Sequence, residues 1–224
     1  MIKIVVFGAG KIADVFHSSI RSSPDLSIAG FTCDRAFITD TQFHGLPLVP
    51  FEEVDTVFPP IDFAMFVAIG YQDLNTVRAE RCRQAHAKGY RLVSWISPGA
   101  HVPQECTIGV NCFVMDGASL QPHARLGDDV FVWSGAVVGH HATIGDHSWL
   151  ASNCTISSTV TVEPNCFFGV NVAIGHAITI GARSIVGAGA VISRSTAPDG
   201  VYVVPDTERY RLDSQRFTKI ARIA

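Results

Sequence analysis

A six-residue period runs without interruption through the second half of the chain. Neither a helix nor a flat strand has this period, whereas a parallel β-helix does, because three short strands make one coil and equivalent positions stack eighteen residues apart. We therefore predict a parallel β-helix over about residues 100–196. Its inward side chains are the aliphatic or Phe residues that begin sixteen consecutive hexads: Val102, Ile108, Val114, Leu120, Leu126, Val132, Val138, Ile144, Leu150, Ile156, Val162, Phe168, Ile174, Ile180, Val186 and Ile192.

Two further positions of the hexad support this register. Four residues after the aliphatic residue the side chain is mostly small, as a narrow corner requires: Cys106, Cys112, Ala118, Ala124, Ala136, Ala142, Ser148, Cys154, Cys166, Ser184 and Ala190. Directly after the aliphatic residue Gly recurs, at Gly109, Gly127, Gly139, Gly145, Gly169, Gly175, Gly181 and Gly187. We expect the chain to turn there in a conformation that a Cβ would strain. Four of the six cysteines lie in the small column, which favours core packing over disulfide or metal roles.

Length and charge exclude several classes of protein. The 224 residues suit one globular unit plus a solenoid. A net charge of -3 and a pI near 6.3 provide no broad attraction to nucleic acid or acidic membranes, so we expect neither as a partner. No apolar run approaches the roughly 20 residues that span a bilayer, and no cleavable leader pattern follows Lys3. We expect a cytoplasmic protein with reduced thiols.

The first hundred residues alternate strands with helices. Residues 2–7 form a predicted buried strand that leads through Gly8-Ala9-Gly10-Lys11 into an amphipathic helix. Further strands are expected at 26–32, 63–69 and 90–96, and a helix N-capped by Asp73 is expected to run to about Lys88. This order predicts an α/β, Rossmann-like domain with a parallel sheet and ligand chemistry at the strand C-termini. Only one mononucleotide-binding half fits into this length.

The Gly-Ala-Gly-Lys turn indicates a phosphate site without proving one. Backbone amides at a helix N-terminus can hold a pyrophosphate, Lys11 would add a positive charge, and Asp34 could accept a hydrogen bond from a ribose hydroxyl. A tight turn with a surface lysine is the alternative interpretation. NAD binding is disfavoured, because the second half of a dinucleotide fold is missing.

The chain divides into three predicted segments: a Rossmann-like domain (residues 1–97), a hexapeptide helix (98–204) and a C-terminal capping segment (205–224). This combination resembles the NeuD/PglD-type family of bacterial sugar acyltransferases. The segments that carry the resemblance are Phe7-Gly8-Ala9-Gly10, Val67-Ala68-Ile69-Gly70, Ile96-Ser97-Pro98-Gly99-Ala100, Val138-Gly139-His140-His141-Ala142-Thr143-Ile144-Gly145, Phe168-Gly169-Val170-Asn171 and Ile185-Val186-Gly187-Ala188-Gly189-Ala190-Val191. The resemblance implies left-handed coils, a homotrimer, and transfer of acetyl from acetyl-CoA to a nucleotide-linked amino sugar in surface polysaccharide or glycan synthesis.

The resemblance also implies the site residues. The general base falls at His140, and the acidic residue that usually follows is His141 here, so either His141 or Asp146 would have to support the base. Trp133 stands where the family has an Asn. The acetyl-CoA positions are Trp149, Gly169, Val170, Gly187 and Ala188. The sugar-nucleotide positions are Gly10, Lys11, Ile12, Asp34 and Gly70.

Other functions remain open at this point. One is O-acetylation of a sialic acid or related sugar, and another is a non-catalytic scaffold that binds sugar nucleotides. A zinc site of the γ-carbonic anhydrase type would need a third imidazole beside His140 and His176, but Gly181 stands at that position, so we expect no metal. His101, His123 and His147 are interpreted as loop residues.

The coils contain no inserted loop that could reach a neighbouring molecule. Something else must then hold the acceptor. We expect the N-terminal domain to bind the nucleotide part and to direct the sugar toward a cleft between two prisms, where His140 and acetyl-CoA would meet. Past Pro205, near-helical spacing of Leu212, Phe217, Ile220 and Ile223 predicts a short helix that caps the solenoid. The basic residues among them, candidates for contact with the CoA phosphates, are Arg209, Arg211, Arg216, Lys219 and Arg222.

Overall fold

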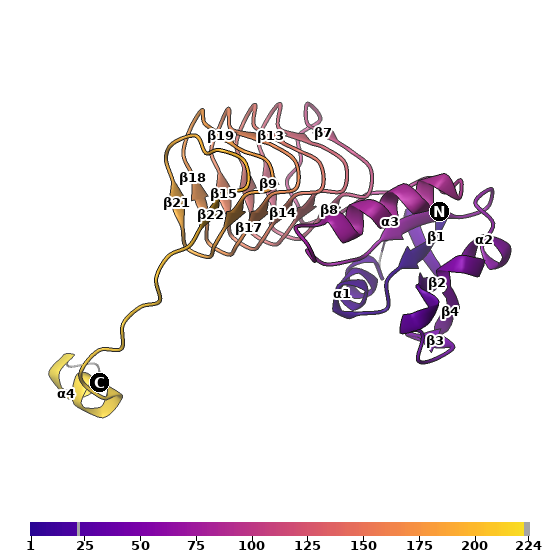
Figure 1. The fold of residues 1–224 in the computed structure, drawn as a ribbon, viewed down its shortest axis with the longest axis horizontal. Helices are drawn as coiled ribbons and strands as arrows, with labels where there is room; N and C mark the ends of the chain where they lie inside the picture. The colour runs from indigo at the N-terminus through magenta and orange to yellow at the C-terminus, as the bar shows by residue number, and fades with distance from the viewer. Residues whose placement is uncertain (22, 222–224) are drawn as a thin grey trace.

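The computed structural model describes residues 1–21 and 23–221 and has an α/β part joined to a three-sided β-helix (Figure 1). The elements of the α/β part are β1 (Ile2–Phe7), α1 (Lys11–Ile20), β2 (Leu26–Cys33), η1 (Arg35–Phe37), β3 (Gln42–Phe43), β4 (Leu46–Pro50), η2 (Phe51–Glu53), α2 (Val54–Val57), β5 (Ala64–Val67) and α3 (Thr76–Ala87). Its sheet has the order β3-β4-β2-β1-β5, parallel except for the β3–β4 pair. The order reverses between β1 and β5, which makes their C-terminal ends the expected ligand edge.

Most of the predicted N-terminal elements are present, but three details differ. Residues 90–96 do not form a fourth strand of this sheet: Leu92 makes one bridge to Met65, and β6 (Trp95–Ile96) pairs with the β-helix instead. The hairpin β3–β4 was missed, because β3 is only two residues long. Helix α3 starts at Thr76, so Asp73 is not its N-cap.

The β-helix consists of two-residue strands whose partners lie eighteen residues apart, as the hexads predict, except at the last pair, where Ile185 faces Val201. The first sheet contains β7 (Thr107–Ile108), β10 (Arg125–Leu126), β13 (Thr143–Ile144), β16 (Thr161–Val162) and β19 (Thr179–Ile180). The second contains β6, β8 (Phe113–Val114), β11 (Phe131–Val132), β14 (Trp149–Leu150), β17 (Phe167–Phe168), β20 (Ile185–Val186) and β22 (Val201–Tyr202). The third contains β9 (Ser119–Leu120), β12 (Val137–Val138), β15 (Thr155–Ile156), β18 (Ala173–Ile174) and β21 (Val191–Ile192).

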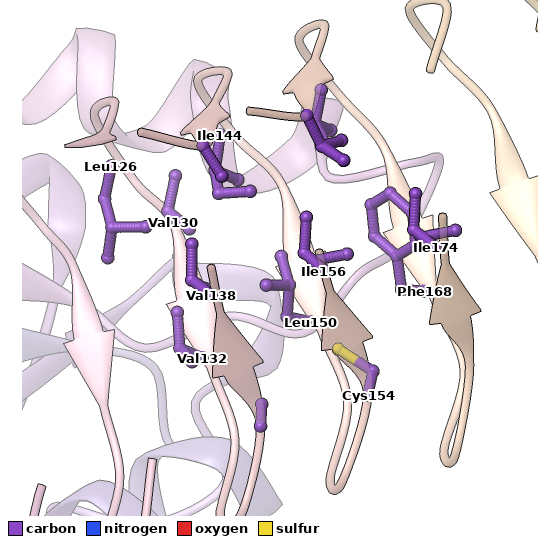
Figure 2. Packing of buried hydrophobic residues seen from close by; sticks show 14 of the residues in the cluster. Leu126, Val130, Val132, Val138, Ile144, Leu150, Cys154, Ile156, Phe168 and Ile174 are labelled. Atoms are coloured by element: carbon purple, nitrogen blue, oxygen red, sulfur yellow. The ribbon is translucent and has the colours of Figure 1, made fainter. Parts of the chain in front are cut away.

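The core of the β-helix confirms the predicted register. All sixteen hexad residues belong to or pack against one apolar cluster, and so do the residues of the small column except Ser148 and Ser184. Figure 2 shows side chains of this cluster, among them Ile144, Leu150 and Cys154, pointing into the prism from successive coils.

The glycines that follow the aliphatic residues are needed for a different reason from the one predicted. A Cβ on Gly139 would lie 2.5 Å from the backbone nitrogen of Ser158, and one on Gly145 would lie 2.7 Å from Glu163 backbone carbon, although neither glycine has a positive φ. The left-handed turn positions come two residues later, for example His141 with φ 59° and His147 with φ 56°. The glycines therefore permit close stacking of coils, whereas the left-handed turn positions are mostly occupied by polar residues.

One column of left-handed turn residues, between the first and second sheets, binds the α/β part. We call Asn111, Asp129, His147 and Asn165 the grip column. Asn111 exchanges hydrogen bonds with the backbone N–H and C=O of Val67, at 2.7 and 3.2 Å. The buried Asp129 carboxylate accepts from Arg78 Nε at 2.7 Å and lies 3.0 Å from His147 Nδ1. His147, interpreted as a loop residue, is therefore part of the contact between the two parts.

Aromatic side chains complete that contact. Phe113, Phe131 and Trp149 project from the second sheet into a cluster with Phe16 and Phe66 of the α/β part. The Arg78 guanidinium lies 4.2 Å from the centre of the Phe131 ring. A boundary near residue 97 stays a prediction, since β6 just before it already belongs to the second sheet.

The C-terminal segment leaves the prism after β22 and ends in α4 (Ser214–Ala221), away from the coils (Figure 1). The helix forms where the spacing predicts it, but its described residues are not buried. Arg222 and Ile223 lie outside the described residues, and the capping role stays a prediction. Within residues 1–21 and 23–221, no helix has the length and apolar character required to cross a membrane.

Candidate active site

His140 lies on the exposed turn between β12 and β13, at the corner between the third and first sheets. Its backbone N–H donates to Gln121 Oε1 of the preceding coil at 3.0 Å. Its Nδ1 is 3.2 Å from Nδ1 of His141, so one ring donates and the other accepts. If His140 donates, its Nε2 is left unprotonated and faces away from this contact, which is the tautomer a general base needs.

The structure separates the two candidate partners of the base. Asp146 sits at the next corner, where its Oδ1 accepts from the backbone N–H of Asp128 at 2.9 Å. His141 is the residue in contact with His140, and His123 of the preceding coil packs on His141 with ring centres 4.7 Å apart. His123, interpreted from the sequence as a loop residue, therefore belongs to this corner.

Four of the predicted acetyl-CoA positions share one corner. Gly169 and Val170 follow β17, and Gly187 and Ala188 follow β20, both at the turn from the second to the third sheet. Val170 and Ala188 are exposed. Trp149 lies elsewhere: it is 4% exposed, beneath the α/β part, with its ring against Phe131. The predicted base and the four donor positions thus occupy different corners of a single chain.

Trp133 directly follows β11, at the turn from the second to the third sheet, one coil before the equivalent Ala151. Its ring packs against Phe113 and Trp149, and its indole N–H is buried with no hydrogen-bond partner in the described part of the chain. The Trp133 side chain is therefore part of the aromatic cluster on the outer face of the second sheet.

The predicted sugar-nucleotide positions meet at the C-terminal edge of the parallel sheet. Gly10 and Lys11 begin α1 after β1, Asp34 follows β2, and Gly70 follows β5. Gly8 has φ 130°, and a Cβ there would lie 2.7 Å from the Ala68 carbonyl oxygen, so this turn requires glycine. Gly10 has open space around its Cβ position, which leaves room for a ligand.

Arg81 is a residue at this edge that the sequence did not indicate. Its Nη2 donates to the Asp34 carboxylate at 2.5 Å, and its guanidinium lies 5.6 Å from the Phe7 ring. Asp34 is therefore paired with a cation, and the edge carries a guanidinium that can meet a phosphate. The basic side chain comes from α3, far along the chain from the glycine turn, so spacing alone could not reveal it.

The cysteines are poor nucleophiles. Burial raises the pKa of Cys112 and Cys154 to about 12 and that of Cys166 to about 11. Their thiols stay protonated at neutral pH, so a direct attack on the donor is favoured over an acyl-cysteine intermediate. Among the residues that the structure describes, no three His, Cys, Asp or Glu side chains converge as metal ligands.

Two models of known protein families match the hexapeptide repeats of this chain. The model of the bacterial transferase hexapeptide family, six repeats, matches residues 105–140 and 123–158, and that of the hexapeptide repeat of succinyl-transferase matches residues 159–194. A search of curated proteins gave no match.

Solved structures match both parts of the chain. A histidine-to-asparagine variant of perosamine N-acetyltransferase from Caulobacter crescentus, in complex with CoA and GDP-perosamine, is 28% identical over 89% of this chain and 92% of that chain, with a TM-score of 0.79. The acetyltransferase domain of PglB from Neisseria gonorrhoeae FA1090, in complex with acetyl coenzyme A, is 26% identical over 88% and 93%, with a TM-score of 0.77. WeeI from Acinetobacter baumannii AYE shares the fold at 22% identity, over 89% and 95%, with a TM-score of 0.77.

These likenesses confirm the predicted architecture, an α/β domain followed by a left-handed parallel β-helix of hexapeptide repeats. The first of these proteins is named as a perosamine N-acetyltransferase and was solved with CoA bound, and the second is named as an acetyltransferase domain and was solved with acetyl coenzyme A bound.

Proposed function

We propose that this hexapeptide-repeat protein is an acetyl-CoA-dependent N-acetyltransferase that acts on a nucleotide-linked amino sugar. The observation that carries the proposal is the likeness, through both parts of the chain, to an enzyme solved with CoA and GDP-perosamine. The proposed site uses surfaces that the fold leaves exposed: the His140 turn, the Val170 and Ala188 turns, and the sheet edge at Gly10.

His140 is the proposed general base. A neutral sugar amine attacks the thioester carbonyl of acetyl-CoA, and its excess proton passes to His140 Nε2 as the carbon–nitrogen bond forms. The carbon–sulfur bond then breaks, and the thiolate of CoA takes the proton back from the imidazolium. The products are an amide and free CoA, so every atom and electron pair is accounted for without a covalent enzyme intermediate.

His141 is the proposed support of the base. Accepting the His140 Nδ1–H would fix the base tautomer, a role that a carboxylate plays in other histidine bases. A neutral imidazole adds no negative charge, so the developing imidazolium is stabilised less than it would be by an acidic neighbour. Activity would then require His141 to be unprotonated.

The donor and the base come from two copies in this proposal. Within one chain His140 and Val170 are at different corners of the prism, and a closed trimer would place one copy's His140 corner beside the next copy's donor corner. The proposed assembly is a homotrimer with acetyl-CoA bound between protomers, and the separation of these two corners within one chain supports it. We also place the reaction in the cytoplasm, where acetyl-CoA is available.

The nucleotide is proposed to bind at the Gly10 edge, with its diphosphate on the backbone amides that begin α1 and beside Lys11 and Arg81. In this arrangement a phosphate of the ligand replaces Asp34 as the partner of Arg81. The Asp34 carboxylate can then accept a hydrogen bond from a ribose hydroxyl. Ile12 and Gly70 border the same edge.

Acceptor-dependent release of CoA tests the proposal. Wild-type protein should release CoA from acetyl-CoA only when a GDP-, UDP- or dTDP-linked amino sugar is added. Release that does not depend on any of these acceptors, or no release with the whole panel, would contradict it.

A further inference from the structure

The loop between β5 and α3 has an unfavourable backbone. Asp73, Leu74 and Asn75 are consecutive and have φ of 47°, 49° and 67°, a region that non-glycine residues avoid. Such strain persists only when surrounding contacts hold it, and it concentrates at functional sites.

The surrounding contacts come from the prism and from Arg78. Asn165 Nδ2 of the grip column donates to the Leu74 carbonyl at 3.1 Å, and Asn75 Nδ2 donates to the Cys166 carbonyl at 3.5 Å. The fully buried Arg78 donates through Nη1 to Asn75 Oδ1 at 3.0 Å and to the Gly70 carbonyl at 3.3 Å. Both ends of the loop are thereby fixed to the prism.

This clamped loop presents Tyr71. The side chain is 54% exposed, although its ring contacts Trp149 and Phe167, with ring centres 5.1 and 4.7 Å away. Tyr71 therefore presents an aromatic ring to solvent from a loop that contacts with the prism hold in place.

The position of Tyr71 connects the two proposed substrate sites. It directly follows Gly70 at the sheet edge proposed for the nucleotide. Its neighbour Phe167 comes two residues before Gly169, where the turn proposed for acetyl-CoA begins. Tyr71 is therefore adjacent along the chain to one proposed substrate site and in contact with a residue that leads into the other.

We propose that Tyr71 binds the sugar ring of the acceptor and orients its amine. A pyranose presents a face of C–H groups that packs on an aromatic ring, while the tyrosine hydroxyl offers a hydrogen bond to a sugar hydroxyl. The inference rests on the proposed function, because it names the contact residue for the same acceptor. Asn165 and Arg78 act through the loop as positioning residues.

Calorimetry on the full chain tests this assignment with matched ligands. Each of a GDP-, a UDP- and a dTDP-linked amino sugar is titrated beside its free nucleoside diphosphate, and the best-bound pair is taken forward. The variants are Tyr71→Ala and Tyr71→Phe, with Tyr210→Ala as control, because Tyr210 is another tyrosine with 57% exposure on the remote C-terminal segment. Asn165→Gly removes the amide donor while keeping a residue that tolerates positive φ.

Tyr71→Ala should weaken binding of the nucleotide sugar about tenfold and change binding of the free nucleotide less than about twofold. Tyr71→Phe should keep most of the affinity, and Asn165→Gly should give a loss between those of Ala and Phe. A Tyr71→Ala variant that binds the nucleotide sugar normally would overturn the inference, as would an equal loss for the free nucleotide.

The results distinguish failure of the Tyr71 assignment from failure of the proposed function. If wild-type protein acetylates a nucleotide sugar and Tyr71→Ala binds it normally, only the role of Tyr71 fails. If wild-type protein binds none of the nucleotide sugars, both proposals fail.

Discussion

His140 and His141 form an imidazole pair in which only one ring can donate to the other. The 3.2 Å contact between their Nδ1 atoms requires at least one ring to be neutral. The pair differs from a histidine–carboxylate dyad because its acceptor is uncharged and can itself be protonated. A neutral acceptor also stabilises the developing imidazolium less than a carboxylate would.

Substitution of these two histidines should separate their roles. His140→Ala should lower kcat by roughly 10²- to 10⁴-fold, the usual contribution of a general base, with the acetyl-CoA dissociation constant unchanged. His141→Asn preserves a residue that tolerates the left-handed turn and should cost less. Steady-state kinetics with the exposed His101→Ala as control measures both effects. A larger loss for His141→Asn than for His140→Ala would reverse the assignment.

At the scale of the coils, the glycine after each aliphatic residue allows neighbouring coils to pack closely. Gly145 has an ordinary backbone, but a Cβ there would meet the backbone of Glu163 and Pro164 at 2.7 Å, and backbone cannot move aside as a flexible side chain can.

Gly145→Ala should therefore reduce the free energy of unfolding by about 1–3 kcal/mol, as overpacking does. The control is Gly10→Ala, where φ is −110° and no atom lies within 4 Å of the Cβ position, so the loss there should stay below about 1 kcal/mol. Chemical denaturation measures both variants. Equal losses would show that contact with the neighbouring coil is not what requires glycine at this position.

The sequence predicts the coils well because each hexad repeats one local environment. Strand, inward residue and corner recur at fixed spacing, so sixteen repeats reinforce one register. The grip column was not predicted, because Asn111, Asp129, His147 and Asn165 look like ordinary polar turn residues until their partners on the α/β part are known. Arg78, Arg81 and Tyr71 were missed for the same reason: each acquires its role through contacts with residues far along the chain.

At the scale of the molecule, the α/β part and the prism share one apolar cluster and a buried ion pair. Removing the α/β part would expose Phe113, Phe131 and Trp149 and leave Asp129 without Arg78. Tests of the separate roles of the two parts therefore belong on the full chain rather than on an isolated prism.

The proposed location of the site between two copies predicts complementation. His140→Ala and Ala188→Trp should each be nearly inactive, since one lacks the base and the other blocks the donor. Mixed trimers formed by co-expression at equal amounts should regain about a quarter of wild-type activity, because one interface in four combines an intact His140 with an intact Ala188. Absence of any recovery in purified mixed trimers would mean that both residues serve a site within one chain.

The identity of the product tests the central claim most directly. Wild-type protein is incubated with acetyl-CoA and the nucleotide-linked amino sugar that supports CoA release, and the product is analysed by mass spectrometry before and after hydroxylamine treatment. We predict a nucleotide sugar that carries one acetyl group and keeps it in hydroxylamine, as an amide does. A product that loses the acetyl group would identify an O-acetyl ester, and an unmodified sugar would show that no transfer occurs; either result would contradict N-acetylation.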